Sequence, residues 1–238
     1  QFPVPAVDFA GLTADLAQMK ADAQANGKYF AGSGGLGYRI VLNSNDTFDL
    51  FRVNSLVSPP SGCSDGATGW GTWSIRTTAG SETFLANHQN PVNGIIFLED
   101  HLWIEGQINT ARITIAVARF PDNPATRPSI TVNNNLTYTN YDGQDVVGLI
   151  AQNNFNVGLR SANNLRIDAA LIAQNGRIGR YHYGSSCGTE YIRSSLTLLG
   201  MIATNQRYGF AYTDGTGYQI RNINYDAYLL YGPPPSFP

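Results

Sequence analysis

Short apolar runs alternate with stretches rich in Gly, Asn, Ser and Asp over most of this chain, and this pattern is typical of β-strands and their turns. The first two runs are separated by the turn-prone Asn43-Ser44-Asn45-Asp46, which predicts a hairpin. We therefore expect an all-β fold. The predicted strands are 38–42, 47–53, 95–98, 102–105, 112–117, 129–132, 147–151, 164–167, 169–173 and 196–203.

One segment near the N-terminus has a helical period instead. Its apolar positions recur at intervals of three and four residues: Phe9, Leu12, Leu16, Met19 and Ala23. Asp8 suits an N-cap, and Asn26 with Gly27 suits a helix stop. We predict an amphipathic helix over 8–26 that caps the open end of a stack of strands, because such an end exposes apolar interior and unpaired edges.

A pentapeptide repeats along the second half of the chain. Leu149-Ile150-Ala151-Gln152-Asn153 recurs at 171–175 and, in looser form, at 201–205, so the copies start 22 and then 30 residues apart. Self-similarity at about 20–30 residues indicates stacked repeats. Aliphatic positions would fill the interior and Asn would occupy corners in left-handed or turn conformations, bonding along the stack. We predict a right-handed parallel β-solenoid (β-helix), with 181–195 bulging out.

We expect three parts within one compact domain. Residues 1–57 form a helix and hairpin cap, 58–93 a surface loop with connecting strands, and 94–238 the solenoid. The last part ends in a proline-rich strap around Pro233-Pro234-Pro235. Proline cannot continue a strand ladder, so we expect the strap to end the pairing and cover the final edge.

Composition narrows the possible partners. Only 13% of residues are charged, with 15 Lys and Arg against 17 Asp and Glu, so nucleic acid is an unlikely partner. Polarity comes from Asn, Ser, Thr, Gln and Gly, as in extracellular β-proteins. The chain has no apolar run of about 18 residues. We expect membrane contact only through a segment absent from this chain. The chain starts at Gln1, which fits a mature or excised fragment.

Two cysteines lie in Gly/Ser-rich loops, Cys63 in 61–64 and Cys187 in 185–188. They lack the spacing of metal ligands, so we predict a disulfide between the loops. The alternative is a pair of free thiols in a reducing compartment.

Three stretches resemble PilX-like type IV pilus assembly proteins. The ending 224–238, with its Tyr-Asp, Leu-Leu and triple-Pro elements, resembles the family's C-terminus, while 94–109 and 168–173 resemble two of its solenoid coils. The likeness covers 94–238 well and 1–57 loosely, and the family's hydrophobic pilin helix is missing here. The resemblance implies a β-solenoid of a bacterial envelope protein with a structural, assembly or adhesive role, and no catalytic residues.

The strongest polar constellation is acidic. Glu99, Asp100 and Glu105 lie close together in sequence, and β-helix lyases and hydrolases use clustered carboxylates. However, neighbouring residues in a strand point to opposite faces, so the cluster is a secondary candidate. Asp168, if buried, requires a partner such as Arg166 or a backbone amide. The three histidines, His88, His101 and His182, are scattered along the sequence and predict no metal site. The sequence also contains no cofactor-binding motif.

Aromatic residues in two loops are the better functional candidates. Exposed aromatic rings stack on sugars and anchor protein interfaces. The alternative for Trp73 and Trp103 is packing within the fold. The candidate binding residues, which belong to loops 58–73 and 181–195, are Trp70, Trp73, Tyr181, His182 and Tyr183.

We therefore expect a non-catalytic extracellular structural, assembly or adhesive domain of a pilus-associated bacterial surface protein. Its partners would be other pilus or cell-envelope proteins, with surface glycans as a further candidate. The alternatives are a carbohydrate-binding adhesin module and a β-helix polysaccharide lyase or hydrolase. DNA capture during pilus-linked uptake is a minor alternative, since it needs a row of arginines on one face.

Overall fold

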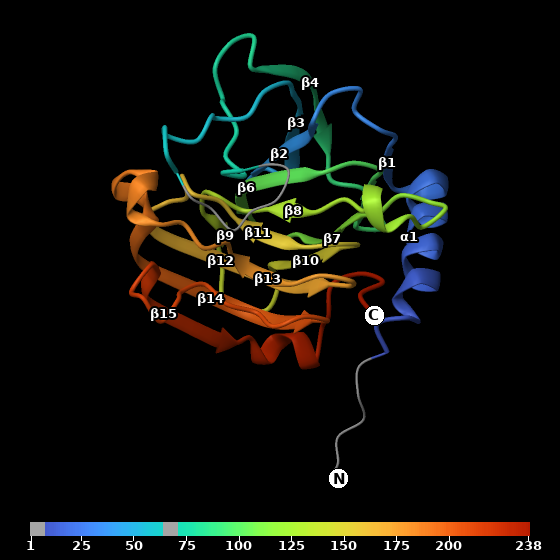
Figure 1. The fold of residues 1–238 in the computed structure, drawn as a ribbon. Helices are drawn as coiled ribbons and strands as arrows, with labels where there is room; N and C mark the ends of the chain where they lie inside the picture. The colour runs from blue at the N-terminus through green and yellow to red at the C-terminus, as the bar shows by residue number, and fades with distance from the viewer. Residues whose placement is uncertain (1–7, 64–70) are drawn as a thin grey trace.

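The structure, a computed structural model, describes residues 8–63 and 71–238. The described chain is mostly β, with one α-helix and a 15-stranded sheet built largely from parallel pairs (Figure 1). This confirms the predicted all-β class and its parallel pairing. The first half comprises α1 (Leu12–Asn26), β1 (Lys28–Phe30), β2 (Gly37–Asn43), β3 (Thr47–Val53), β4 (Glu82–Gln89), β5 (Ile95–Leu98), β6 (Leu102–Ile108), β7 (Arg112–Val117) and the 3-10 turn η1 (Pro124–Thr126). The second half comprises β8 (Ile130–Thr131), β9 (Leu136–Tyr138), β10 (Val146–Ala151), β11 (Phe155–Val157), β12 (Asn164–Ala173), β13 (Ile178–Arg180), η2 (Ser185–Cys187), η3 (Thr189–Tyr191), β14 (Ile192–Thr204), β15 (Gly217–Tyr225) and η4 (Ala227–Leu230).

The parallel pairs form three ladders, in which each strand lies beside one from an earlier part of the chain. The first joins β1, β5, β7, β10, β12 and β14. The second joins β6, β8, β11 and β13. The third runs from β6 through β9, β12 and β14 to β15. The long strands β12 and β14 take part in two ladders, so the chain changes direction within their length.

The repeated pentapeptide stacks in the first ladder. Leu149 is in register with Leu171, as the 22-residue spacing predicts. The predicted 30-residue spacing to the third copy is wrong, because Leu171 is in register with Ile202 and not with Met201. Side-chain alternation explains the difference. Ile202 packs against the main core, whereas Met201 packs on the opposite side of the strand.

Strands of the first ladder are apolar on both faces. Ile115 and Leu149 point into the main core, while the neighbouring Ala116 and Ile150 belong to a second cluster on the outer side. Helix α1 contributes its predicted stripe of Leu12, Leu16, Met19 and Ala23 to this second cluster, where each is at most 5% exposed. An outer face this apolar needs a cover, and α1 supplies it.

The position of α1 differs from the prediction in two ways. The helix begins at Leu12, because Asp8 accepts hydrogen bonds from the backbone amides of Ala10 and Gly11 and so holds a separate turn. The helix also lies along the side of the strands in place of capping an open end (Figure 1). Gln174 fixes its start by donating to the Phe9 carbonyl and the Thr13 hydroxyl.

The C-terminal strap lies on the same outer side, and not over the final edge as predicted. The Thr114 hydroxyl donates to the Pro235 carbonyl at 2.5 Å, and Arg112 donates to the Pro233 carbonyl at 2.8 Å. Phe237 packs against outward residues of β10 and β12, such as Val146 and Ala170. The apolar outer face takes the strap, and among the described residues β15 forms a ladder with β14 alone, with one further bridge from Gly217 to Ala211.

The predicted hairpin is confirmed as the antiparallel pair β2 and β3. A third strand, β4, which lies within the predicted surface loop and connecting strands of 58–93, pairs with β3. Asparagines bond along the stack as expected. For example, Asn175 donates to the Gln152 carbonyl at 2.7 Å, and the Asn163 amide donates to the Ser194 hydroxyl at 2.8 Å. Of the two conformations expected for these asparagines, left-handed or turn, the left-handed one is not found: the described non-glycine residues with positive φ are Asp46, Trp73, Thr110 and Ser236.

Candidate functional site

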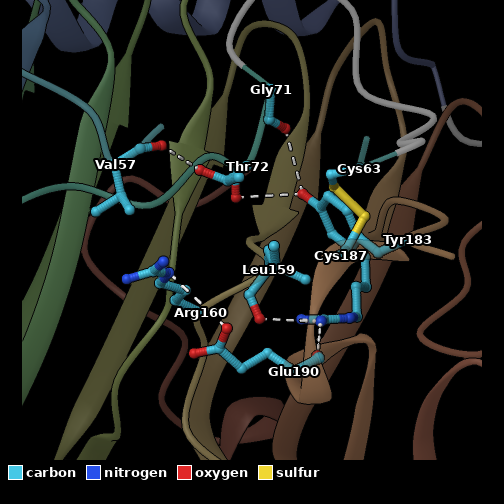
Figure 2. Close-up of a disulfide and its surroundings, with 10 residues drawn as sticks. Val57, Cys63, Gly71, Thr72, Leu159, Arg160, Tyr183, Cys187 and Glu190 are labelled. Atoms are coloured by element: carbon cyan, nitrogen blue, oxygen red, sulfur yellow. Dashed lines mark hydrogen bonds and ion pairs between the residues drawn. A yellow bond between two sulfur atoms is a disulfide. The ribbon is translucent and has the colours of Figure 1, made fainter. Parts of the chain in front are cut away.

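The two loops that hold the cysteines meet at a Cys63–Cys187 disulfide (Figure 2), which confirms the predicted bond. The cysteines are 124 positions apart in the sequence. Cys187, at 0% exposure, packs with Leu159 and Tyr183, and Cys63 covers this small cluster from the outside. The bond therefore fastens the loop after β3 onto the loop after β13.

Tyr183 is a structural link between these loops and does not face solvent. Its side chain is 1% exposed, and its hydroxyl donates to the Thr72 carbonyl at 3.2 Å and lies 3.4 Å from the Gly71 carbonyl oxygen (Figure 2). The Thr72 hydroxyl in turn donates to the Val57 carbonyl at 2.9 Å. A buried tyrosine satisfied in this way fixes the position of the 71–73 segment.

Trp73 also points inward, with 4% of its surface exposed. Its backbone has a φ of 52°, a left-handed conformation that costs a bulky residue about 1–3 kcal/mol and persists only where surrounding contacts enforce it. Those contacts are present: the Trp73 carbonyl accepts from the Trp103 indole at 3.1 Å and the Asn133 amide at 2.8 Å. The Tyr181 ring stacks on Trp73, with ring centroids 6.3 Å apart.

Of the remaining aromatic candidates, Trp70 lies outside the described residues. His182 is at the surface, with 39% of its side chain exposed, and pairs with Asp214 at 2.7 Å between Nε2 and Oδ2. This hydrogen bond, with those from Thr216, lowers the pKa of Asp214 to about 2. Packing thus accounts for Trp73 and Tyr183, and the binding roles of all five candidates stay predictions.

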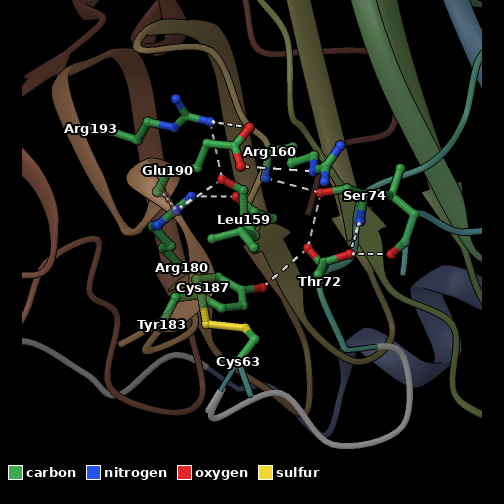
Figure 3. A network of polar contacts seen from close by, with 12 residues as sticks. Cys63, Thr72, Ser74, Leu159, Arg160, Arg180, Tyr183, Cys187, Glu190 and Arg193 are labelled. Carbon is green, nitrogen blue, oxygen red and sulfur yellow. Dashed lines mark hydrogen bonds and ion pairs between the residues drawn. A yellow bond between two sulfur atoms is a disulfide. The ribbon is translucent and has the colours of Figure 1, made fainter. Parts of the chain in front are cut away.

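A buried arginine holds the same region together (Figure 3). Arg180 is 0% exposed, and burial lowers the pKa of its guanidinium to about 10. It lies over the rings of Tyr183 and Tyr218, with 5.0 and 5.7 Å from its Cζ to the ring centroids. The guanidinium donates to four oxygens: the carbonyls of Gly158, Leu159 (3.0 Å) and Glu190 (2.7 Å), and the Ser161 hydroxyl (2.8 Å). These bonds tie two loops, 158–163 and 181–191, to one side chain.

A polar cavity of about 120 Å³ adjoins the disulfide-linked loops. The Thr131 side chain lines it, is 1% exposed, and has a hydroxyl without a hydrogen-bond partner in the described part of the chain. Such a group requires a water or a ligand atom. The remaining lining residues include Arg39, Trp103, Glu105, Asn134 and Arg160.

The acidic cluster is divided among separate structural contacts. Glu99 binds Lys20 at 2.5 Å and accepts from the Tyr29 hydroxyl at 2.9 Å. Asp100 accepts from the Ser33 amide and hydroxyl and pairs with Arg119 at 2.5 Å. Glu105 pairs with Arg39 at 2.7 Å, and Arg39 also pairs with Glu82 at 2.8 Å. Each carboxylate therefore connects a different pair of elements.

Asp168 is fully buried and satisfied, as the sequence required. It accepts from Arg166 Nε at 2.9 Å, from the Tyr138 backbone amide at 3.2 Å and from the Tyr141 hydroxyl at 2.8 Å. The expected arginine and backbone partners are thus confirmed. The residue connects β12 to β9 and to the loop that follows it.

His101 is held in its neutral form. Its Nδ1 accepts from the Ser129 backbone amide at 3.0 Å, and burial lowers the pKa of the ring to about 4. Protonation would replace an acceptor with a donor facing that amide. The ring also packs edge-on against Trp73, at 5.8 Å between centroids, so it supports the loop segment described above.

Sequence reasoning missed a different group of exposed residues, at the end of the third ladder. Large apolar side chains are exposed there: Ile220 (57%), Ile223 (42%) and Tyr225 (56%) on β15, with Tyr208 (52%) beside them. Grooves follow this end of the molecule on two sides, and both include Tyr208 and Ile223 in their walls. The alternation in 217–225 was the available signal, and its many polar residues obscured it.

Within residues 8–63 and 71–238, no group of three or more His, Cys, Asp or Glu side chains is arranged to hold a metal ion. The same part of the chain contains no helix of the length and hydropathy needed to cross a membrane. Comparison with protein-family models, with curated proteins and with solved structures finds no match to the chain.

Proposed function

We propose that this chain is a right-handed parallel β-solenoid that serves as a non-catalytic structural or assembly module of a pilus-associated bacterial surface protein. The observation that carries the proposal is that the acidic side chains of the predicted cluster form structural contacts. The carboxylates of Glu99, Asp100 and Glu105 all bind cations or donors of the fold itself. A β-helix lyase or hydrolase would need two carboxylates directed at one substrate.

Three ladders of parallel strands support the solenoid. A chain that returns to the same ladder after each crossing builds up layers, and the stacked Leu149, Leu171 and Ile202 mark three of them. The right-handed sense follows the strong preference of parallel crossovers for that hand.

The extracellular location is supported by the disulfide, because such bonds persist in oxidising compartments. The resemblance of 94–109, 168–173 and 224–238 to PilX-like proteins supports the pilus association. Partners would then be other pilus or cell-envelope proteins. DNA capture has less support, since arginines that might form a binding row, such as Arg119, Arg127 and Arg166, pair with Asp100, Asp122 and Asp168.

Carbohydrate binding is the second candidate function, and it is favoured by the Thr131 hydroxyl, which has no hydrogen-bond partner within residues 8–63 and 71–238. The cavity of about 120 Å³ combines this hydroxyl with Trp103, two arginines and two asparagines. Planar polar side chains around an aromatic residue suit the hydroxyl groups of a neutral saccharide unit.

A polysaccharide panel tests the proposal. Incubation with the purified chain should release no new reducing ends or unsaturated products, because the cluster offers no free pair of carboxylates. Cleavage that is lost in both Glu99→Gln and Asp100→Asn, but kept in the matched control Glu190→Gln, would overturn the non-catalytic role. Binding of a polysaccharide without cleavage would favour the second candidate, provided that Thr131→Val and Arg160→Ala weaken this binding.

A further inference from the structure

Two unpaired strand edges lie at opposite ends of one continuous set of paired strands. The path runs from β4 through β3, β2, β6, β9, β12 and β14 to β15. Among the described residues, β4 forms a ladder with β3 alone and β15 with β14 alone, apart from single bridges at their first residues, Glu82 to Ala79 and Gly217 to Ala211. Figure 1 shows the two strands at opposite ends of the molecule. Each therefore presents free backbone donors and acceptors along its outer side, which on β15 begin after Gln219, because Phe210 and Arg221 bond to the backbone of Tyr218 and Gln219.

The two edges have matching direction and length. Strand β4 is antiparallel to β3, which is antiparallel to β2, so β4 runs the same way as β2. Every later pair from β2 to β15 is parallel, so β15 runs that way too. The edges contain 8 and 9 residues. A second copy placed end to end would therefore set its β4 beside β15 as a parallel neighbour, as β14 already is.

Both edges also carry exposed apolar side chains, which surface strands normally avoid. On β4, Phe84 is 55% exposed and Leu85 is 45% exposed. On β15, Ile223 is in register with Leu198, a core residue at 0% exposure, yet is itself 42% exposed. The column of buried side chains formed by Leu136, Ile167 and Leu198 thus ends uncovered at β15.

The charges at the two ends differ in balance: the β4 end has two aspartates and one arginine (Arg52, beside Thr83 of β4) without ion pairs among the described residues, and the β15 end has arginines. Asp46 and Asp49 lie in and beside the β2–β3 turn, next to β4, and neither forms an ion pair within the described residues. Arg221 lies on β15 and donates to the carbonyls of Tyr218 and Gln219, so its charge is likewise without a carboxylate there. Arg207 is exposed near the same end. Opposite charges favour contact between unlike ends over contact between like ends.

We propose that copies of this chain associate head to tail, with β15 of one copy pairing in parallel with β4 of the next. Such an interface uses two different surfaces, so it extends into an open row of copies unless the row closes. In the assembly role proposed above, the partner would then be a second copy of this chain. This inference rests on that proposed role. Self-association and polysaccharide cleavage are measured separately, so either proposal can fail alone.

Sedimentation velocity over a concentration series tests the pairing with one blocked edge at a time. The wild-type chain should form dimers and longer species as its concentration rises. Ile223→Lys, which blocks β15, and Leu85→Lys, which blocks β4, should each remain monomeric. Their equimolar mixture should form dimers and nothing larger, because the first keeps a free β4 and the second a free β15.

The control is Ala17→Lys, an exposed position on α1, which packs on the outer side of the first ladder, and it should associate like the wild type. Thermal unfolding of each variant verifies that it is folded. A wild-type chain that stays monomeric up to millimolar concentration would overturn the proposal, as would a mixture that stays monomeric. Association of Leu85→Lys by itself would also overturn it and would indicate pairing between two β15 edges.

Discussion

Removal of the Cys63–Cys187 disulfide is expected to lower the free energy of unfolding by about 4–5 kcal/mol. The bond closes a loop of 124 positions, and the loop-closure entropy of the unfolded chain gives this magnitude. Urea unfolding of the Cys63→Ser, Cys187→Ala double variant measures the effect. Alanine at 187 avoids placing a hydroxyl among Leu159 and Tyr183.

The control is the wild-type chain under a mild reductant, which should show the same loss as the double variant. A decrease below about 1 kcal/mol in both would mean that the buried contacts of Tyr183 and Arg180, and not the disulfide, hold the two loops together.

Acidification from pH 7 to pH 4 is expected to remove roughly 3 kcal/mol of stability through His101, at about 1.4 kcal/mol for each pKa unit. The pKa of the ring is about 4 in the folded chain, against an ordinary value of 6.5. Between these values the unfolded chain binds more protons, so the free energy of unfolding falls as the pH falls. The contribution is complete above pH 6.5 and is lost down to pH 4.

His101→Asn provides the matched comparison, because its amide oxygen can accept from the Ser129 amide without titrating. The quantity to measure is the difference between wild type and variant in the unfolding free energy across this range. This difference also removes the contribution of His88, whose pKa is lowered by burial. Equal pH slopes for the two proteins would contradict the role of His101.

The strands of the first ladder could be predicted because a strand buried on both faces needs a continuous run of apolar residues, as in 146–151 and 169–173. The register between copies could not. Alignment of the repeated pentapeptide matches residue types, whereas strand pairing matches the directions of the side chains. For that reason Ile202, and not Met201, lies beside Leu171. The bounds of β4 and β15 were not predicted, because polar residues interrupt the alternation of apolar positions in 82–89 and 217–225.

The candidate site was predictable in its location but not in its chemistry. Glycines and the two cysteines marked the loops, and the disulfide joins them. Whether an aromatic ring faces solvent depends on what the loops cover. Packing within the fold was therefore only an alternative for Trp73, and the interior position of Tyr183 was not predicted. Arg180 gave no signal, because its partners are carbonyl oxygens from Gly158, Leu159 and Glu190, which only the tertiary fold brings together.

The central claim is that the repeats stack in parallel with their aliphatic side chains inside, and methyl–methyl NOE spectroscopy tests it most directly. Neighbouring strands lie about 4.8 Å apart, so residues in register on one face have their methyl groups in contact. We predict strong cross-peaks from Leu171 to both Leu149 and Ile202. Absence of both, or a Leu171 contact with Met201 in place of Ile202, would contradict the stacking.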